Sequence, residues 1–339
     1  MCVRMGISVL VAVFASACAG CIEAIQQQAA IDHYVRGQLL ADRGEHEAAL
    51  EELALAIKDY PKLSTAHAAT GDIHRRRGSY ELARRSYERA CDTNPYAFRP
   101  HYNLGVTYQL LAEASGGFPR VQDFLQKAVY VYLRAAELAP ADFDTQLNIS
   151  ACYYQMGKYE LAEQYCRAAT KTNPRSAEAW CNLGTIYDSQ NRLYEAIRAY
   201  KTSLELNVHQ PQLLLNLGAT YVRQGRIKSA LGTYEHAANE DPNNAAPWRQ
   251  IGTCYFQLKE FLKALEAYER AILLDPGNAD AYRGTGVVYM TQYVMDRSKT
   301  ALRDKGLAAW HASLEINPNQ NDLRRLVEKY TPTVAKPQL

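Results

Sequence analysis

The sequence predicts an all-α protein, a solenoid of about eight helix-turn-helix repeats closed by a C-terminal capping helix. Three ladders of identical residues predict it, and their common step is 34 residues. The glycine ladder is Gly37, Gly71, Gly105, Gly184, Gly218, Gly252 and Gly286. The alanine ladder is Ala49, Ala83, Ala128, Ala162, Ala196, Ala230 and Ala264. The proline ladder is Pro61, Pro95, Pro140, Pro174, Pro242, Pro276 and Pro318. Because one such helix pair cannot bury its apolar faces alone, this period predicts that the pairs stack.

The pattern is most complete over residues 245–278. It comprises Trp248, Gly252, Tyr255, Ala264, Tyr268, Ala271 and Pro276. This spacing and these residue types resemble the tetratricopeptide repeat (TPR) superfamily. The resemblance implies that each unit is an antiparallel pair, helix A then helix B, and that the units form a right-handed superhelix. Glycine on helix A and the first alanine on helix B are expected where the two axes come closest, and the proline ends helix B.

The eight units are expected to start near residues 30, 64, 98, 143, 177, 211, 245 and 279. Tyrosine is abundant, with 24 Tyr against 7 Phe, and eleven of these tyrosines occupy two repeat positions. One position holds Tyr108, Tyr153, Tyr187, Tyr221, Tyr255 and Tyr289, and the other holds Tyr87, Tyr132, Tyr200, Tyr234 and Tyr268. We therefore expect these eleven side chains in the core rather than on a sticky surface.

Three residues depart from the ladders. Ser150 replaces the glycine of unit four, Val208 the proline of unit five, and Gly306 the first alanine of unit eight. Two units are also long: their prolines are 45 and 42 residues apart, which exceeds 34 by 11 and 8. The extra residues are expected as loops between helices A and B, near 114–119 and 293–300, where repeat insertions sometimes serve function.

A last helix is expected within residues 319–330, because Leu323, Leu326, Val327 and Tyr330 recur at helical spacing. Its apolar stripe would cover the exposed end of unit eight, as the capping helix of a solenoid does. Residues 331–339 contain two prolines and no apolar period, which predicts a disordered tail.

The N-terminus has the order of a secretory signal over residues 1–21: a short basic start, an apolar run and small residues. A linker is expected at 22–29. Small residues before Cys18 or Cys21 resemble the lipid-attachment motif of bacterial TPR lipoproteins, which implies a lipid anchor on a membrane of the cell envelope, facing the periplasm or outside. The alternatives are cleavage after Ala17 to give a secreted protein, and an uncleaved signal anchor.

Composition and motifs disfavour an enzyme. The net charge of +2 provides no overall attraction for nucleic acid. The eight histidines form no paired set, the cysteines form no metal-binding pattern, and no phosphate loop or catalytic elbow is present. We therefore expect no catalytic residues, cofactor, metal or small-molecule substrate.

A ladder of amides is expected to line the concave groove, on helix A two residues before the glycine position. It consists of Asn103, Asn148, Asn182, Asn216 and Gln250, with Arg249 and Arg283 beside it. A carboxamide offers an acceptor and two donors, which suit the N–H and C=O groups of an extended peptide. The row resembles the asparagine ladder in the TPR half of O-GlcNAc transferases. The alternative is that the amides bond only to neighbouring helices.

Together these features predict a non-enzymatic scaffold that binds a protein partner through its groove. A module that holds extended peptides or client segments through the amide ladder is one alternative. A structural spacer that associates with itself through its ends is another.

Overall fold

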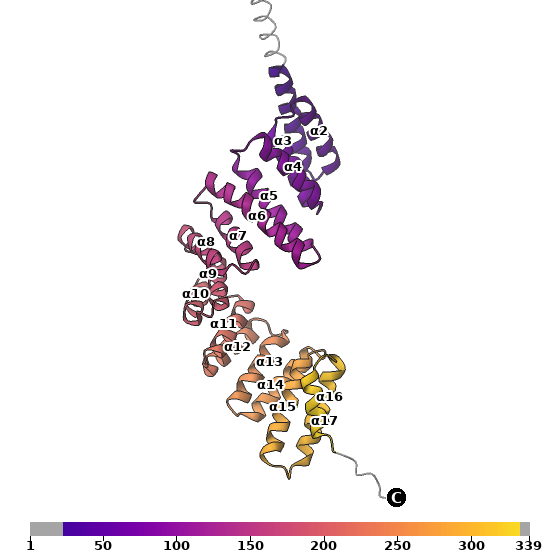
Figure 1. The fold of residues 1–339 in the computed structure, drawn as a ribbon, viewed down its shortest axis with the longest axis vertical. Helices are drawn as coiled ribbons and strands as arrows, with labels where there is room; N and C mark the ends of the chain where they lie inside the picture. Colours follow the sequence, from indigo (N-terminus) through magenta and orange to yellow (C-terminus); the bar gives the residue numbers. More distant parts are fainter. Residues whose placement is uncertain (1–22, 333–339) are drawn as a thin grey trace, which may run out of the picture. The chain divides into compact units, whose positions relative to one another are not determined.

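The computed structural model describes residues 23–332, and over this range the chain consists of helices joined by short turns, with no strand (Figure 1). The chain divides into two compact units, Met1–Pro174 and Arg175–Leu339. The all-helical, paired-repeat fold expected from the sequence is confirmed.

Unit 1 contains four helix pairs. Residues 23–42 form a helix that pairs with α2 (His46–Asp59). The next pairs are α3 (Ser64–Arg76) with α4 (Tyr80–Thr93), α5 (Phe98–Ala114) with α6 (Phe118–Leu138), and α7 (Phe143–Gln155) with α8 (Tyr159–Thr172).

Unit 2 contains four more pairs and one further helix. The pairs are α9 (Ala177–Ser189) with α10 (Leu193–Leu206), α11 (Pro211–Arg223) with α12 (Ile227–Glu240), α13 (Ala245–Gln257) with α14 (Phe261–Leu274), and α15 (Ala279–Met295) with α16 (Thr300–Ile316). The further helix is α17 (Asn321–Tyr330). Helix A of repeats two to eight begins at the residue expected from the period. The first repeat differs, because residues 23–29, expected as a linker, are helical.

The glycine of helix A leaves room for an aromatic ring of helix B. A Cβ added to Gly218 would lie 2.4 Å from the Tyr234 ring, and one added to Gly252 would lie 2.8 Å from the Tyr268 ring. Those distances are too short for real contacts, so any side chain at the glycine would displace the ring. The five tyrosines at this helix B position are at most 5% exposed, and the seven ladder alanines are fully buried. Of the six tyrosines at the helix A position, Tyr153, Tyr255 and Tyr289 are only partly buried.

The departures from the pattern are compensated within their own repeats. Ser150 stands where the other repeats have glycine, and the ring position opposite it holds the smaller, fully buried Cys166. The Ser150 hydroxyl donates to the carbonyl oxygen of Ala162 at 2.9 Å, so the glycine and alanine positions do meet in this repeat. In repeat eight, the ring facing Gly286 is the larger indole of Trp310.

The two long repeats do not carry the expected loops. In repeat three, α5 has 17 residues and α6 has 21, against 13 and 14 in repeat two, so the excess of 11 lies entirely in helix. In repeat eight, α15 and α16 each have 17 residues, and the connection over 296–299 stays short. The expectation failed because propagating an existing helix adds one hydrogen bond per residue, whereas a loop adds none.

The turn between helices A and B requires a left-handed residue in six repeats. Glycine supplies it at Gly44, Gly78, Gly157 and Gly225, with φ between 72° and 80°. Asn191 and Lys259 take the same place with φ of 60° and 62°. Asparagine tolerates this conformation, but lysine adopts it only with strain.

The capping helix is present. Leu323 and Val327 of α17 are 1% and 7% exposed and pack with Leu307 and Trp310 of α16. The predicted signal, lipid attachment at Cys18 or Cys21, and the last seven residues of the predicted tail lie outside the described residues.

Candidate functional site

A groove of about 550 Å³ lies on the inner side of unit 1, among the first helix, α3 and α5. Tyr34 and Gln38 line it from the first helix, Thr65 and Ala68 from α3, and Phe98 from α5. All three helices are the A members of their pairs, so the period that stacks the pairs also aligns these side chains. The lining of the groove thus combines small side chains with two aromatic side chains, Tyr34 and Phe98.

Asp72 is the polar centre of this groove. Its Oδ1 accepts a hydrogen bond from the Tyr87 hydroxyl at 2.5 Å and one from the Asn103 amide nitrogen at 3.1 Å. The Arg75 guanidinium lies 3.7 Å from the same oxygen. Burial, and then the hydrogen bond to Asp72, raise the pKa of Tyr87 well above its ordinary value. The Oδ1 atom of Asp72 is therefore already engaged by side chains of the same protein.

Two further cationic side chains line the groove, and no carboxylate of the described residues neutralises them. Arg76 on α3 and Arg99 on α5 are both exposed lining residues. Neither forms an ion pair with any residue in the range 23–332. The groove therefore presents two positive charges that a ligand can neutralise.

The predicted amide ladder is divided between the units. In unit 1, the Asn103 amide nitrogen donates to Asp72, and that of Asn148 donates to the Tyr102 hydroxyl at 3.3 Å. Each of these two amides thus bonds to a neighbouring helix through one N–H, as the alternative interpretation expects. Asn103 keeps a second N–H and its carbonyl oxygen for another partner.

In unit 2, the predicted residues occupy equivalent, half-buried places on three helices. They are Asn182 on α9, Asn216 on α11 and Gln250 on α13. Asn216 accepts a weak contact from Gln212 at 3.4 Å. Whether these amides bind a peptide stays a prediction.

The two predicted arginines of unit 2 have different surroundings. Arg249 on α13 lies 3.8 Å from Asp280. Arg283 on α15 is exposed and lines a hollow of about 460 Å³ beside the start of α17. Met290 on the same helix is buried against Leu307 and Trp310, because α15 is longer than its counterparts and carries its core further. Arg283 therefore lies beside the capping helix.

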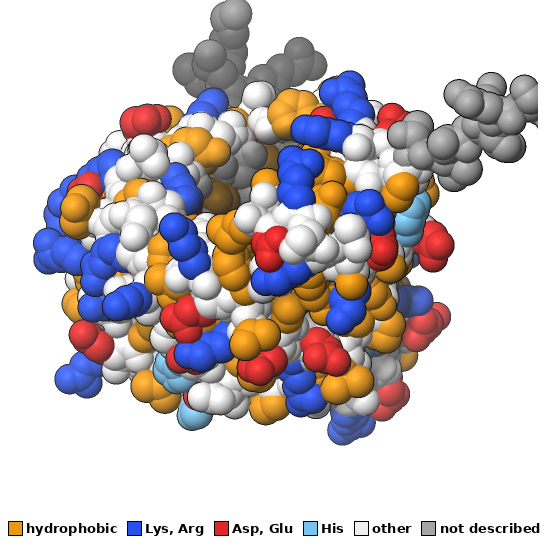
Figure 2. All heavy atoms as spheres, turned by 90° about the horizontal axis from the view of Figure 1, so that it is seen from below, with side chains coloured by type: hydrophobic (Ala, Val, Ile, Leu, Met, Phe, Trp, Pro, Cys, Tyr) orange, Lys and Arg blue, Asp and Glu red, His pale blue; other side chains and the backbone are white. Residues whose placement is uncertain are grey.

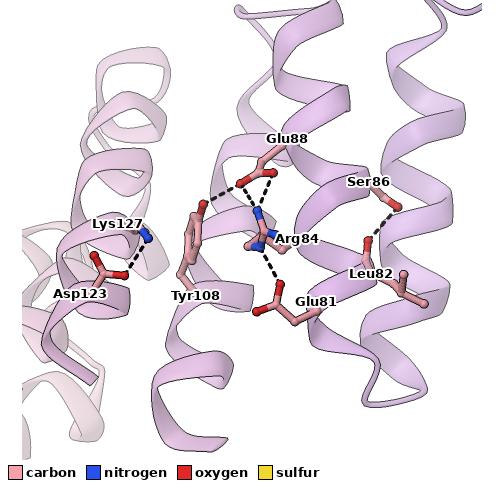
Figure 3. Close-up of polar contacts among 8 residues, drawn as sticks. All are labelled: Glu81, Leu82, Arg84, Ser86, Glu88, Tyr108, Asp123 and Lys127. Carbon is pink, nitrogen blue, oxygen red and sulfur yellow. Dashed lines mark hydrogen bonds and ion pairs between the residues drawn. The ribbon is translucent and has the colours of Figure 1, made fainter. Parts of the chain in front are cut away.

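A second hollow in unit 1, about 530 Å³, lies where α4 meets the extended parts of α5 and α6. Figure 3 shows Arg84 held between Glu81 and Glu88, and Glu88 accepting the Tyr108 hydroxyl at 2.8 Å. Lys127 pairs with Asp123 at 2.7 Å. Among the described residues Arg120 is left as one exposed lining cation outside an ion pair, against two in the inner groove. This hollow therefore offers an anionic ligand less charge than the inner groove.

The sequence did not place Asp72, Arg76 or Arg99 in a binding groove; Arg76 was noticeable only as part of the basic cluster Arg75–Arg77. One signal was available, because Asp72 is the only charged residue at its repeat position; the equivalents are Gln38, Val106, Ala151, Thr185, Ala219, Thr253 and Val287. Nothing in the period separates Arg76 and Arg99 from ordinary surface arginines. Only the folded structure shows that they flank one groove.

The described part of the chain holds no cluster of three or more His, Cys, Asp and Glu suited to a metal ion. No helix in that part is long and apolar enough to cross a membrane. The face drawn in Figure 2 mixes basic, acidic and apolar side chains, without a large area of one charge.

Comparison with known proteins identifies the family. The family model of the cilia and flagella-associated protein 70 C-terminal domain matches residues 17–232, which is more than half of the chain. The chain belongs to this family. A tetratricopeptide repeat model also matches residues 245–278. TPR arrays are in general protein-interaction scaffolds, and the fold is typically non-catalytic.

Two curated relatives share part of the chain. The protein CTR9 homolog of Arabidopsis thaliana is 29% identical over 147 residues, 42% of this chain and 12% of its own length. The anaphase-promoting complex subunit CDC16 of Saccharomyces cerevisiae is 25% identical over 161 residues, 48% of this chain and 19% of its own length. The chain thus spans less than a fifth of either relative.

Two solved structures share the fold. The APC/C hetero-tetramer Cut9–Hcn1 aligns with a TM-score of 0.52 at 15% identity, over 84% of this chain and 52% of that one. The pilF protein of Pseudomonas aeruginosa aligns with a TM-score of 0.51 at 20% identity, over 64% of this chain and 94% of that one. At these identities the likeness shows the fold alone.

Proposed function

We propose that this chain is a non-enzymatic scaffold that binds an extended segment of a partner protein in the inner groove of unit 1. The observation that carries the proposal is the pair of uncompensated arginines, Arg76 and Arg99, beside Asp72, whose Oδ1 already accepts from Tyr87 and Asn103. The segment's carboxylates pair with these arginines. Its main chain bonds to the free oxygen and N–H of Asn103, and its apolar side chains contact Phe98 and Tyr34.

The experiment selects random displayed peptides on the full chain and measures the affinity of the selected sequences by calorimetry. We expect selected peptides rich in Asp and Glu. Reversing both arginines, Arg76→Glu with Arg99→Glu, should weaken binding about tenfold, because two exposed ion pairs contribute roughly 0.5–1 kcal/mol each.

The matched control is Arg89→Glu, which reverses an exposed arginine of α4 that does not line the groove. It should leave the affinity unchanged. If the control and the double variant lost the same affinity, the effect would come from general surface charge. If the double variant lost no affinity, the peptide would not bind in this groove.

Two proposals concern where the scaffold works. The family's description supports a place in cilia or flagella, which imaging of the tagged protein in ciliated cells would test. Lipid attachment at Cys18 or Cys21 would instead hold it to an envelope membrane through two acyl chains.

A further inference from the structure

The 11 extra residues of repeat three take no part in the inner groove, but they build much of the second hollow of unit 1. Gly105 and Gly71 are each the eighth residue of their helix A, so the four extra residues of α5 are 111–114. Ala128 is the eleventh residue of α6 whereas Ala83 is the fourth of α4, so the seven extra residues of α6 are 118–124. Half of the residues that line the second hollow belong to these two stretches: Leu111, Ala114, Arg120, Asp123 and Phe124. We call it the repeat-three hollow.

The repeat-three hollow and the inner groove lie at opposite ends of α5. Arg99 and Asn103, near the start of α5, line the inner groove, whereas Leu111 and Ala114, at its end, line the repeat-three hollow. Leu111 follows Arg99 by 12 residues, which correspond to about 18 Å along a helix. The two are therefore separate sites on one unit.

Apolar side chains form the least exposed part of the repeat-three hollow. Tyr108 and Leu111 are 8% and 7% exposed, and Phe124 is partly buried. The ring centroids of Tyr108 and Phe124 are 6.2 Å apart. The volume of about 530 Å³ lies within the roughly 300–1,000 Å³ that is usual for binding pockets. An apolar side chain that enters the hollow can therefore be surrounded by these residues, as the anchor residues of an interface are.

The charges around this apolar part are paired, with one exception. Figure 3 shows Tyr108 of α5 between Arg84 of α4, which pairs with Glu88, and Lys127 of α6, which pairs with Asp123. Arg120 is the exception, because it is exposed and forms no ion pair with any acidic residue in the range 23–332. One carboxylate of a ligand would therefore complete the charge balance of the hollow.

We propose that the insertion in repeat three creates a second docking site, for a segment of a partner protein that carries an apolar side chain beside an Asp or Glu. The apolar side chain contacts Leu111 and Phe124, and the carboxylate pairs with Arg120. The scaffold then holds two segments, one at each end of α5. The segment in the repeat-three hollow is less acidic and more apolar than the segment in the inner groove.

Peptide selection with counter-selection on a blocked variant tests this site. Random displayed peptides that bind the full chain are kept only if they fail to bind Ala114→Trp, because Ala114 is an exposed lining residue and an indole there would fill the hollow. We expect the kept peptides to carry an aromatic or aliphatic residue beside Asp or Glu. Calorimetry should show that Arg120→Glu weakens their binding about two- to fivefold, because one exposed ion pair is lost.

Each variant has a matched control. Glu113→Trp places the same indole one residue earlier, and Arg85→Glu reverses an exposed arginine of α4; neither residue lines the hollow. Both controls should leave the affinity of the kept peptides unchanged. The inner-groove variant, Arg76→Glu with Arg99→Glu, should leave it unchanged too. All of these substitutions replace exposed side chains, so thermal unfolding should show that every variant stays folded.

Three outcomes overturn the proposal. If every peptide that binds the full chain also binds Ala114→Trp, the repeat-three hollow is not a docking site. If Arg85→Glu weakens binding as much as Arg120→Glu does, the effect comes from general surface charge. If the inner-groove variant abolishes binding of the kept peptides, they belong to the inner groove. Failure of the inner-groove proposal alone would leave the kept peptides and their dependence on Arg120 intact, so the two proposals can fail separately.

Discussion

The two ends of the repeat array are finished differently. At the C-terminal end, α17 follows the last pair directly and buries Leu323 and Val327 against Trp310. At the N-terminal end, the described residues leave Leu39 53% exposed at a position that is buried in every other repeat. Each inner repeat is covered by its neighbours, so only the two terminal repeats need an additional segment to cover their apolar faces. The contrast teaches that the period specifies the inner repeats but not how their ends are protected.

The largest expected effect is at the capped end. Leu323→Asp should lower the free energy of unfolding of unit 2 by about 3–5 kcal/mol, because it leaves an uncompensated charge in a buried site. Leu39→Asp on the first helix should cost less than half as much, since its side chain already reaches water. Urea unfolding followed by circular dichroism measures both, and equal losses would break the contrast between the ends.

Glycine substitutions compare the packing inside the first and last repeats. A Cβ on Gly286 would lie 2.2 Å from the rigid Trp310 indole, whereas one on Gly37 would lie 2.9 Å from the flexible Leu53 side chain. Gly286→Ala should therefore cost about 1–3 kcal/mol and Gly37→Ala under about 1 kcal/mol. Thermal unfolding ranks the two variants, and the reverse order would contradict the packing described here.

The smallest effect concerns the turns between helices A and B. Lys259 and Gly44 share the left-handed turn position, with φ of 62° and 80°. Lys259→Gly should relieve strain and stabilise the protein by up to about 1 kcal/mol, and Gly44→Ala should destabilise it by a similar amount. Chemical denaturation of both variants measures the pair. A loss of stability in Lys259→Gly would show that contacts of the lysine side chain stabilise the protein by more than the strain of the left-handed backbone destabilises it.

Much of the fold follows from one period in the sequence. The starts of helix A at Ser64, Phe98 and Phe143 were predictable because glycine, alanine and proline each mark a fixed packing role. The form of the long repeats was not predictable, because a 34-residue template has no way to divide 11 extra residues between helix and loop. The structure divides them as four residues of α5 and seven of α6.

The candidate site was less predictable than the fold. Asn103, one residue of the predicted amide ladder, is among the residues that line the groove, and its binding of a peptide stays a prediction. Its bond to Asp72 was not foreseen, because that contact joins residues 31 apart on two neighbouring A helices. Whether a groove arginine is compensated depends on side-chain partners from other helices, which spacing along one sequence does not reveal.

Site-specific photo-crosslinking tests the central claim most directly. A photoreactive amino acid replaces Thr65, which lines the inner groove, or Leu82, which is 47% exposed on α4 and does not. With a selected acidic peptide, the account predicts a crosslink from Thr65, none from Leu82, and loss of the Thr65 product in the Arg76→Glu, Arg99→Glu background. A crosslink from Leu82 alone would contradict it.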